Sequence, residues 1–229
     1  MKKISAANSN LFIVIPAYNE STVMYGVVKK IRMRGYTHII VVDDGSDDAT
    51  RERAVRAGAT VVRHSINRGK GAAVKTGIEA AKQLGAEMVV TMDGDGQHDP
   101  IDISDTVKFL GKGNDVVIGS RFLSRQYIPF GKKIANAIAN HISLILYRVR
   151  TSDSQSGFRG YGKKALDVVN TFSDRYEFDM EMFREIRRHK LKTIEIPIHV
   201  SYTPYSQNKR NRHDYLSAII TVIKLFLPF

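Results

Sequence analysis

An α/β fold with a doubly wound, mostly parallel sheet flanked by helices is predicted for this chain of 229 residues. In the first half, short β-rich apolar runs alternate with helical patterns, which is typical of strand–helix–strand units. Three of the apolar runs end in polar or acidic clusters, "PAYNE", "DDGSDD" and "DGDGQ". Because ligands bind beyond the carboxyl ends of the strands in such sheets, we expect these clusters to meet at one edge.

The first strand–helix units follow from local pattern. "LFIVIPA" (11–17) is apolar and β-prone, which predicts a strand, and "STVMYGVVKKIRMRG" (21–35) has apolar residues at helical spacing before a glycine. "HIIVVDDGS" (38–46) predicts a second strand, which ends in acid. The pattern then predicts a helix at 48–58, again closed by glycine, and a short strand at 60–64.

The same alternation continues to residue 121. "GKGAAVKTGIEAAKQLG" (69–85) predicts a glycine-rich loop and a helix, in which Lys75 is a candidate to contact a ligand, and "EMVVTMDGD" (87–95) predicts a strand. A helix at 103–113 and a strand at 115–121 complete the regular half of the chain.

The second half of the chain is less regular. We expect a basic helix at 131–150, a polar loop at 152–161 and a helix that starts at "KKALDVV". Toward the C-terminus the predicted elements are a helix at 179–190, a strand at 192–200, a basic loop at 201–213 and a terminal helix at 214–229.

Composition limits the classes of protein. Hydrophobic residues make up 43% of the chain and charged residues 25%, which is typical of a soluble globular protein. The absence of cysteine excludes disulfides and thiolate metal sites. Near the N-terminus a short apolar run is interrupted by Pro16, so we interpret it as a first strand and not as a signal peptide.

The net charge of +12 is unevenly distributed. Residues 1–120 have 16 Lys and Arg against 14 Asp and Glu, whereas residues 121–229 have 19 against 9. The basic half could face nucleic acid, anionic lipid or a phosphorylated substrate. The apolar last 14 residues are too short to span about 30 Å of hydrocarbon, and they either lie in a membrane interface or cover the core.

The acidic cluster after the 87–95 run suggests a metal site. Asp93 and Asp95 lie one residue apart in a glycine-rich turn, and Gln97 could add a neutral oxygen. Hard oxygen ligands suit Mg²⁺ or Mn²⁺, which proteins bind through one or two carboxylates together with substrate phosphates. A D-x-D pair alone is a weak signal, and the alternative is an ordinary surface turn.

Several motifs together resemble those of family 2 glycosyltransferases. "IPAYNE", "VVDDGSDDAT", "NRGKGAAVKTGI", "MDGDGQHDP", "GSR" and "QSGFRGY" occur here in the order typical of that family, and the branch of dolichyl- or polyprenyl-phosphate sugar synthases is the most similar. The resemblance covers about residues 11–210. It implies the GT-A fold as a single domain over 1–229, with a nucleotide-sugar half (1–120) and an acceptor half (121–229).

The resemblance also implies roles for residues on the donor side. Pro16, Tyr18 and Glu20 match the segment that lines the base and ribose of the nucleotide sugar. Asp44 matches a residue that hydrogen-bonds the base, and Asp93 matches an acid near the ribose and the transferred sugar.

Two further pairs complete the donor side by resemblance. Asp95 and Gln97 match the ligands of Mg²⁺ or Mn²⁺ in the phosphate-sugar branch. Lys209 and Arg210 lie in a segment similar to the loop that closes over the donor diphosphate, although an exposed basic loop would have the same composition.

On the acceptor side, the resemblance implies that Arg121 and a cation on the next helix hold a phosphate. The branch usually has arginine on that helix, whereas this chain has Lys132 and Lys133. Asp153 matches an acid that serves as general base toward hydroxyl acceptors in many family members. A phosphate acceptor needs little such help, so Asp153 could instead orient Arg121. Asp93, Asp95 and Asp153 are thus the candidate catalytic residues.

These features predict an inverting, metal-dependent hexosyltransferase. The expected donor is a GDP- or UDP-hexose, and the expected acceptor is polyprenyl phosphate. We expect a cytoplasmic enzyme, peripheral on the inner face of the membrane. One alternative acceptor is a sugar hydroxyl of a lipid-linked or cell-surface glycan. A nucleotidyltransferase would usually have a Gly-rich loop where "PAYNE" stands, and no recognised nucleic-acid motif appears, so we expect no nucleic-acid partner.

Overall fold

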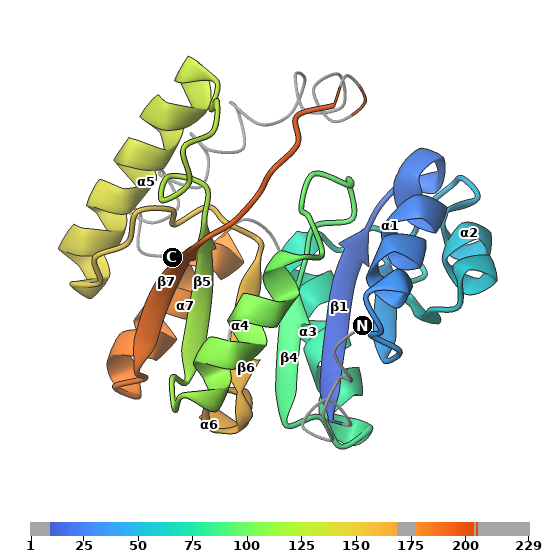
Figure 1. The fold of residues 1–229 in the computed structure, drawn as a ribbon, viewed down its shortest axis with the longest axis horizontal. Coiled ribbons are helices and arrows are strands. Elements are labelled where there is room, and N and C mark those ends of the chain that lie inside the picture. The colour runs from blue at the N-terminus through green and yellow to red at the C-terminus, as the bar shows by residue number, and fades with distance from the viewer. Residues whose placement is uncertain (1–9, 169–176, 204, 206–229) are drawn as a thin grey trace.

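The computed structural model describes residues 10–168, 177–203 and 205. In this part of the chain seven strands form one sheet, with helices on both faces (Figure 1). From one edge to the other the strands are β3 (Thr60–Arg63), β2 (Ile39–Asp43), β1 (Leu11–Ala17), β4 (Met88–Thr91), β6 (Arg159–Gly162), β5 (Val116–Ser120) and β7 (Thr193–Pro197). All neighbours pair in parallel except β6, which is antiparallel to β4 and β5. The predicted mixed α/β fold with a mostly parallel sheet is confirmed.

The alternation of side chains along β1 separates two hydrophobic cores. Every residue of β1 is buried. Ile13 and Ile15 belong to one core cluster, with residues of α1 (Ser21–Met33), α2 (Thr50–Ala57) and α4 (Asp102–Gly111). Phe12 and Val14 belong to the other cluster, with residues of α3 (Lys70–Gln83), α6 (Lys163–Val168) and α7 (Glu177–Arg188). A strand with helices on both faces must be apolar throughout, which explains the unbroken run "LFIVI".

The helix α5 (Phe130–Tyr147) lies beyond the carboxyl ends of β5 and β7 (Figure 1). Its residues Ile142 and Tyr147 pack against the second core. The predicted helix at 131–150 is correct in kind, but the helix ends where Arg148 adopts a left-handed φ of 53°. None of the described helices is long and apolar enough to cross a membrane. The predicted terminal helix at 214–229 lies outside the described residues.

The strand β6 corrects the predicted polar loop at 152–161, because its last residues form a strand in the middle of the sheet. The polar composition of this segment had suggested a loop. Gly160 has a different role, since a Cβ there would lie 2.3 Å from Cγ2 of Thr106 on α4. The glycine therefore lets a helix approach the sheet closely.

Candidate active site

The three polar clusters predicted at strand ends do meet at the carboxyl edge of the sheet. The end of β1 pairs with the end of β2, and the Asp44 N–H donates to the carbonyl of Ala17 over 2.8 Å. After β4, the backbone at Gly94 lies so close to β1 that a Cβ would be 2.8 Å from the carbonyl oxygen of Pro16. One surface is thus built from "PAYNE", "DDGSDD" and "DGDGQ".

Asp44 is buried and accepts three hydrogen bonds. They come from the backbone N–H of Gly69 (2.7 Å), the backbone N–H of Arg68 (3.0 Å) and Nδ1 of His64 (2.7 Å). Nε2 of His64 is in turn 2.9 Å from the hydroxyl of Thr76. The carboxylate therefore fixes the entry to α3, a contact that the sequence did not reveal, while the predicted contact of Asp44 with the base of a nucleotide stays a prediction.

The segment after β1 is held from across the site by Tyr205. Pro16 is buried within β1, Tyr18 is 40% exposed, and the carboxylate of Glu20 accepts a hydrogen bond of 2.9 Å from the hydroxyl of Tyr205. Burial and the neighbouring charge of Glu20 raise the pKa of Tyr205, so its hydroxyl stays protonated and donates. The predicted contact of Pro16, Tyr18 and Glu20 with the base and ribose stays a prediction. Tyr205 was missed, although the sequence around it was noted as basic and tyrosine-rich.

Asp93 forms an ion pair at the centre of the site. Its Oδ1 lies 2.6 Å from Nζ of Lys70, the first residue of α3. Its backbone N–H donates to Nδ1 of His98 over 3.2 Å. Burial lowers the pKa of His98 and outweighs the charges of Asp93 and Asp95, which act to raise it. A lowered pKa agrees with a neutral ring whose Nδ1 has no proton and accepts this hydrogen bond. The cation that meets Asp93 is therefore Lys70, and the predicted contact of Lys75 with a ligand stays a prediction.

Asp95 and Gln97 form a tight turn, and a backbone hydrogen bond from the segment after β7 holds this turn in place. Oδ1 of Asp95 accepts the N–H of Gln97 over 3.0 Å, and the carbonyl of Gln97 accepts the N–H of Ser201 over 2.8 Å. Among the described residues no group of three or more His, Cys, Asp or Glu side chains could hold a metal. A single partly exposed carboxylate with an amide oxygen beside it fits Mg²⁺ or Mn²⁺ only when substrate phosphates complete the shell, which is how these ions usually bind.

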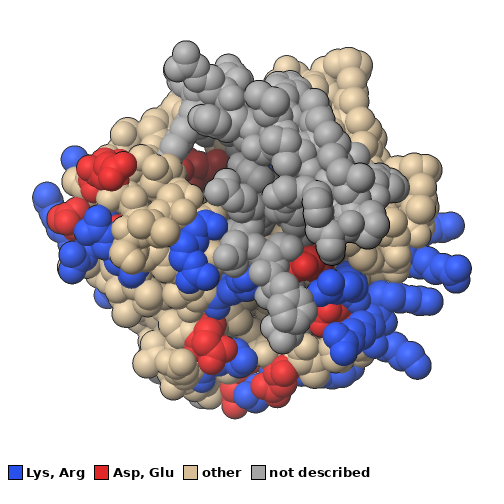
Figure 2. Space-filling model, turned by 180° about the vertical axis from the view of Figure 1, so that it is seen from behind, with Lys and Arg blue, Asp and Glu red and all other residues tan. Residues whose placement is uncertain are grey.

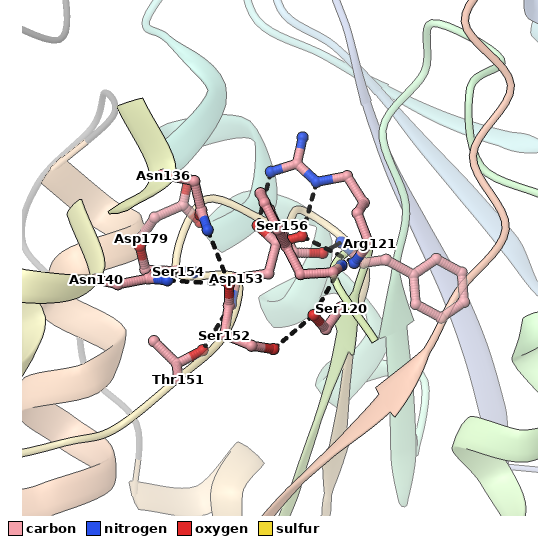
Figure 3. A network of polar contacts seen from close by, with 12 residues as sticks. Ser120, Arg121, Asn136, Asn140, Thr151, Ser152, Asp153, Ser154, Ser156 and Asp179 are labelled. Atoms are coloured by element: carbon pink, nitrogen blue, oxygen red, sulfur yellow. Dashed lines mark hydrogen bonds and ion pairs between the residues drawn. The ribbon is translucent and has the colours of Figure 1, made fainter. Parts of the chain in front are cut away.

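Arg121 and Asp153 form a fork-like ion pair (Figure 3). Nε of Arg121 donates to Oδ2 over 2.7 Å and Nη2 donates to Oδ1 over 2.6 Å, while the backbone N–H of Arg121 also donates to Oδ2 over 3.0 Å. Asp153 is fully buried. Burial lowers the pKa of Arg121, but the hydrogen bonds and charge of Asp153 outweigh it and raise the pKa overall. A permanently charged guanidinium is thus fixed at the end of β5.

The turn that carries Asp153 is anchored from three elements, and Figure 3 shows its contacts with α5 and with Ser120. Glu195 of β7 accepts the N–H of Ser152 over 2.8 Å and its hydroxyl over 2.9 Å. From α5, the side-chain amides of Asn136 and Asn140 donate to the carbonyl of Ser152 over 2.8 and 2.9 Å. The hydroxyl of Ser120 on β5 lies 2.6 Å from that of Ser152. Arg121 is therefore fixed relative to both the sheet and α5.

The two candidate lysines on α5 differ in their surroundings. Nζ of Lys132 lies 4.3 Å from the centre of the Tyr202 ring, and Tyr202 is near enough to Arg121 to affect its pKa. Lys133 is exposed. Of the two lysines, Lys132 is therefore the one that contacts Tyr202, a residue whose charge acts on Arg121. Lys209 and Arg210 lie outside the described residues.

A sequence model described as "Glycosyl transferase family 2" matches residues 12–169. The chain belongs to this family. This decides for glycosyl transfer and against the nucleotidyltransferase considered above.

Two relatives of this family 2 glycosyltransferase have informative names. It is 33% identical over 223 residues to the UDP-N-acetylglucosamine–dolichyl-phosphate N-acetylglucosaminyltransferase of Methanococcus voltae, covering 87% of this chain and 89% of that protein. It is 28% identical over 199 residues to the polyprenol monophosphomannose synthase of Mycolicibacterium smegmatis, covering 81% and 75%.

Solved structures confirm the GT-A fold. The glucosyl-3-phosphoglycerate synthase of Mycobacterium tuberculosis, in complex with Mn²⁺, UDP-glucose and phosphoglyceric acid, superposes with a TM-score of 0.69. The comparison covers 98% of this chain and 83% of that one, at 19% sequence identity. That similarity establishes the fold and leaves the acceptor open.

Proposed function

We propose that this family 2 glycosyltransferase moves a hexose from a nucleoside-diphosphate sugar to polyprenyl phosphate, with inversion at the anomeric carbon. The observation that carries the proposal is Arg121, a buried cation held by Asp153 at the carboxyl edge of the sheet. A fixed guanidinium with a lysine nearby suits the oxygens of a phosphate. The names of the two relatives, which mention dolichyl phosphate and polyprenol phosphate sugars, support the same acceptor class.

The surroundings of Asp153 favour a phosphate over a sugar hydroxyl as the acceptor. A hydroxyl needs a general base, but the carboxylate of Asp153 is fully buried and both oxygens accept from Arg121. A phosphate monoester is already ionised at neutral pH and needs no base. Asp153 then acts as a positioning residue that holds Arg121.

The reaction follows as a single displacement. An oxygen of the acceptor phosphate forms a bond to the anomeric carbon on the face opposite the leaving group, and the bond from that carbon to the nucleoside diphosphate breaks, with its electron pair leaving on the diphosphate. We assign Asp93 and Asp44 to the donor, and the partly exposed ring of Tyr18 to stacking on its base. A divalent ion held by Asp95 and Gln97 would neutralise charge on the diphosphate.

The acceptor class also implies a membrane surface as partner. Residues 121–150 contain six Lys and Arg and neither Asp nor Glu. Figure 2, which views the molecule from behind, shows Lys and Arg side chains projecting from the lower part of the right-hand flank, while the described atoms of its upper part are mostly uncharged. This basic segment suits an anionic cytoplasmic leaflet, where each cation contributes on the order of 1 kcal/mol.

A transfer assay tests the proposal. The protein is incubated with Mn²⁺ and radiolabelled UDP-GlcNAc, UDP-glucose or GDP-mannose, and with polyprenyl phosphate, unphosphorylated polyprenol or phosphoglycerate as acceptor. We expect label to enter the organic phase with polyprenyl phosphate only, and EDTA to abolish the transfer. Transfer to polyprenol, or to phosphoglycerate alone, would show that the acceptor is wrong.

Variants in the same assay test the phosphate site. Lys132→Met should raise the KM for polyprenyl phosphate roughly 10- to 100-fold, the scale of one charged hydrogen bond, while the donor KM is unchanged. Lys133→Met is the matched control, because Lys133 is exposed. Equal effects of the two substitutions would contradict the assignment of Lys132.

A further inference from the structure

The Asp93–Lys70 ion pair lies directly against a glycine of another loop. A Cβ built on Gly157 would lie 2.3 Å from Oδ1 of Asp93 and 2.6 Å from Nζ of Lys70. Gly157 is not among the glycines with positive φ, so its backbone conformation is open to any residue. A glycine is therefore required at this position because any side chain would clash with the ion pair.

The loop that contains Gly157 also contains the partner of Arg121. Asp153, four residues earlier, holds the guanidinium through both carboxylate oxygens. The carbonyl of Gly157 accepts a hydrogen bond of 2.9 Å from the hydroxyl of Thr91, the last residue of β4, two residues before Asp93. Residues 153–157 thus contact the candidate acceptor cation at one end and the candidate donor acid at the other.

We propose that Lys70 and Gly157 are positioning residues for Asp93, and that the loop 153–157 sets the distance between the donor and acceptor sites. This inference rests on the proposed function for the identity of the two sites. Lys70 holds the carboxylate of Asp93 toward the loop through their contact of 2.6 Å, and the missing side chain of Gly157 lets the pair close against it. Because a displacement needs its reacting atoms aligned at about 3–3.5 Å, a small error in this distance lowers the rate strongly.

The ion pair itself is expected to add little stability. Its side chains keep 27% and 17% of their surface exposed, so water can still solvate the carboxylate of Asp93 when Lys70 is replaced, and the loss of unfolding free energy stays below that of a fully buried pair. Loss of Lys70 should therefore change kinetics far more than thermal stability, which separates a positioning role from a structural one.

Glycine substitutions give the sharpest test. Gly157→Ala should lower kcat at least tenfold and weaken binding of UDP or GDP with Mn²⁺ in calorimetry. Gly111→Ala is the matched control, because a Cβ there meets nothing within 4 Å. In the Asp93→Asn background, adding Gly157→Ala should lower kcat by less than a further threefold, because both substitutions act through the same contact. Full additivity, or wild-type kinetics of Gly157→Ala, would overturn the inference.

Lysine substitutions test the charge. Lys70→Met should lower kcat with a change in Tm no larger than that of Lys82→Met, which removes an exposed ion pair with Glu79 on the same helix. Lys70→Arg should recover part of the rate. If Lys70→Met lowers Tm so far that unfolding explains the lost activity, Lys70 has a structural role and the assigned positioning role is wrong.

The two proposals fail in different ways. If the wild type transfers nothing to polyprenyl phosphate, the proposed acceptor is wrong. Nucleoside-diphosphate binding needs no acceptor, so weaker binding by Gly157→Ala in that case would still support the positioning of Asp93. Unchanged binding by both Gly157→Ala and Lys70→Met would overturn the inference even if the acceptor is right.

Discussion

Arg159 is a charged side chain in the centre of the sheet, 1% exposed. Its Nη2 donates to the carbonyl of Ser154 over 3.0 Å and pairs with Asp179 of α7 at 3.0 Å, and the guanidinium lies 5.4 Å from the centre of the Phe183 ring. Burial lowers its pKa, but the charge of Asp179 outweighs this and raises the pKa overall. Arg159 therefore stays charged and joins α7 to the turn that holds Arg121.

Removing this charge should destabilise the protein. Arg159→Met leaves Asp179 and the Ser154 carbonyl without their partner, so we expect the free energy of unfolding to fall by about 3 kcal/mol. Urea unfolding followed by circular dichroism measures it. Lys163→Met, which removes an exposed i,i+4 pair with Asp167, should change it by less than about 1 kcal/mol. An equal fall in unfolding free energy for the two substitutions would show that the buried pair stabilises the protein no more than an exposed pair does.

At the level of single residues, the sequence revealed the acids of the site better than their partners. Asp44 and Asp93 stand out because they follow buried strands. Tyr205 lies 185 residues from the Glu20 that it contacts, and Asp44 meets Gly69 from 25 residues away. No local pattern fixes which side chains converge over such distances, so Lys70 and Tyr205 were found only in the structure.

At the level of elements, α5 has its polar side toward the protein. Its only buried residues are Asn136 and Ser143. The opposite face exposes large apolar side chains at helical spacing, among them Phe130 (76%), Ile134 (47%), Ile138 (53%) and Ile145 (63%). Asn136 also binds the turn that fixes Arg121, so this apolar face has a fixed position relative to the proposed phosphate site.

We expect α5 to contribute to membrane binding. Ile138→Asp with Ile145→Asp should weaken binding to anionic vesicles by at least tenfold, since burying one such side chain is worth about 1.5–3 kcal/mol. Liposome flotation at low and high salt measures it, with Ile66→Asp as the control, because Ile66 is exposed outside α5. Removal of residues 216–229 tests the apolar tail in the same way. If the intact protein never floats with anionic vesicles at low salt, the peripheral-membrane prediction is wrong.

Element types were predictable where local pattern dictates them. The strands and helices up to residue 121 agree with the structure apart from their ends, because apolar periodicity and glycine stops are local signals. The strand β6 was missed because "RGYG" is short and rich in glycine. Its strand state comes from pairing with β4 on one side and β5 on the other.

At the scale of the whole molecule, the second half of the chain completes a site that begins in the first. Glu20 meets Tyr205, and the loop after β4 pairs with the segment after β7 through the Gln97 and Ser201 backbones. The family resemblance implied two functional halves, and the strand order joins them within one sheet. The division at residue 120 is thus one of proposed function, since the sheet continues across it.

The strand order also bears on synthesis of the protein by the ribosome. β1 to β4 pair only among themselves until β6 arrives, whereas both neighbours of β5 come later in the chain. A nascent chain released after residue 150 therefore holds β5 with no strand beside it and leaves one edge of β4 bare. Such edges invite association between chains. Limited proteolysis of this truncated chain should cut around 116–120 while 11–91 resists; equal protection would show that β5 finds another partner during translation.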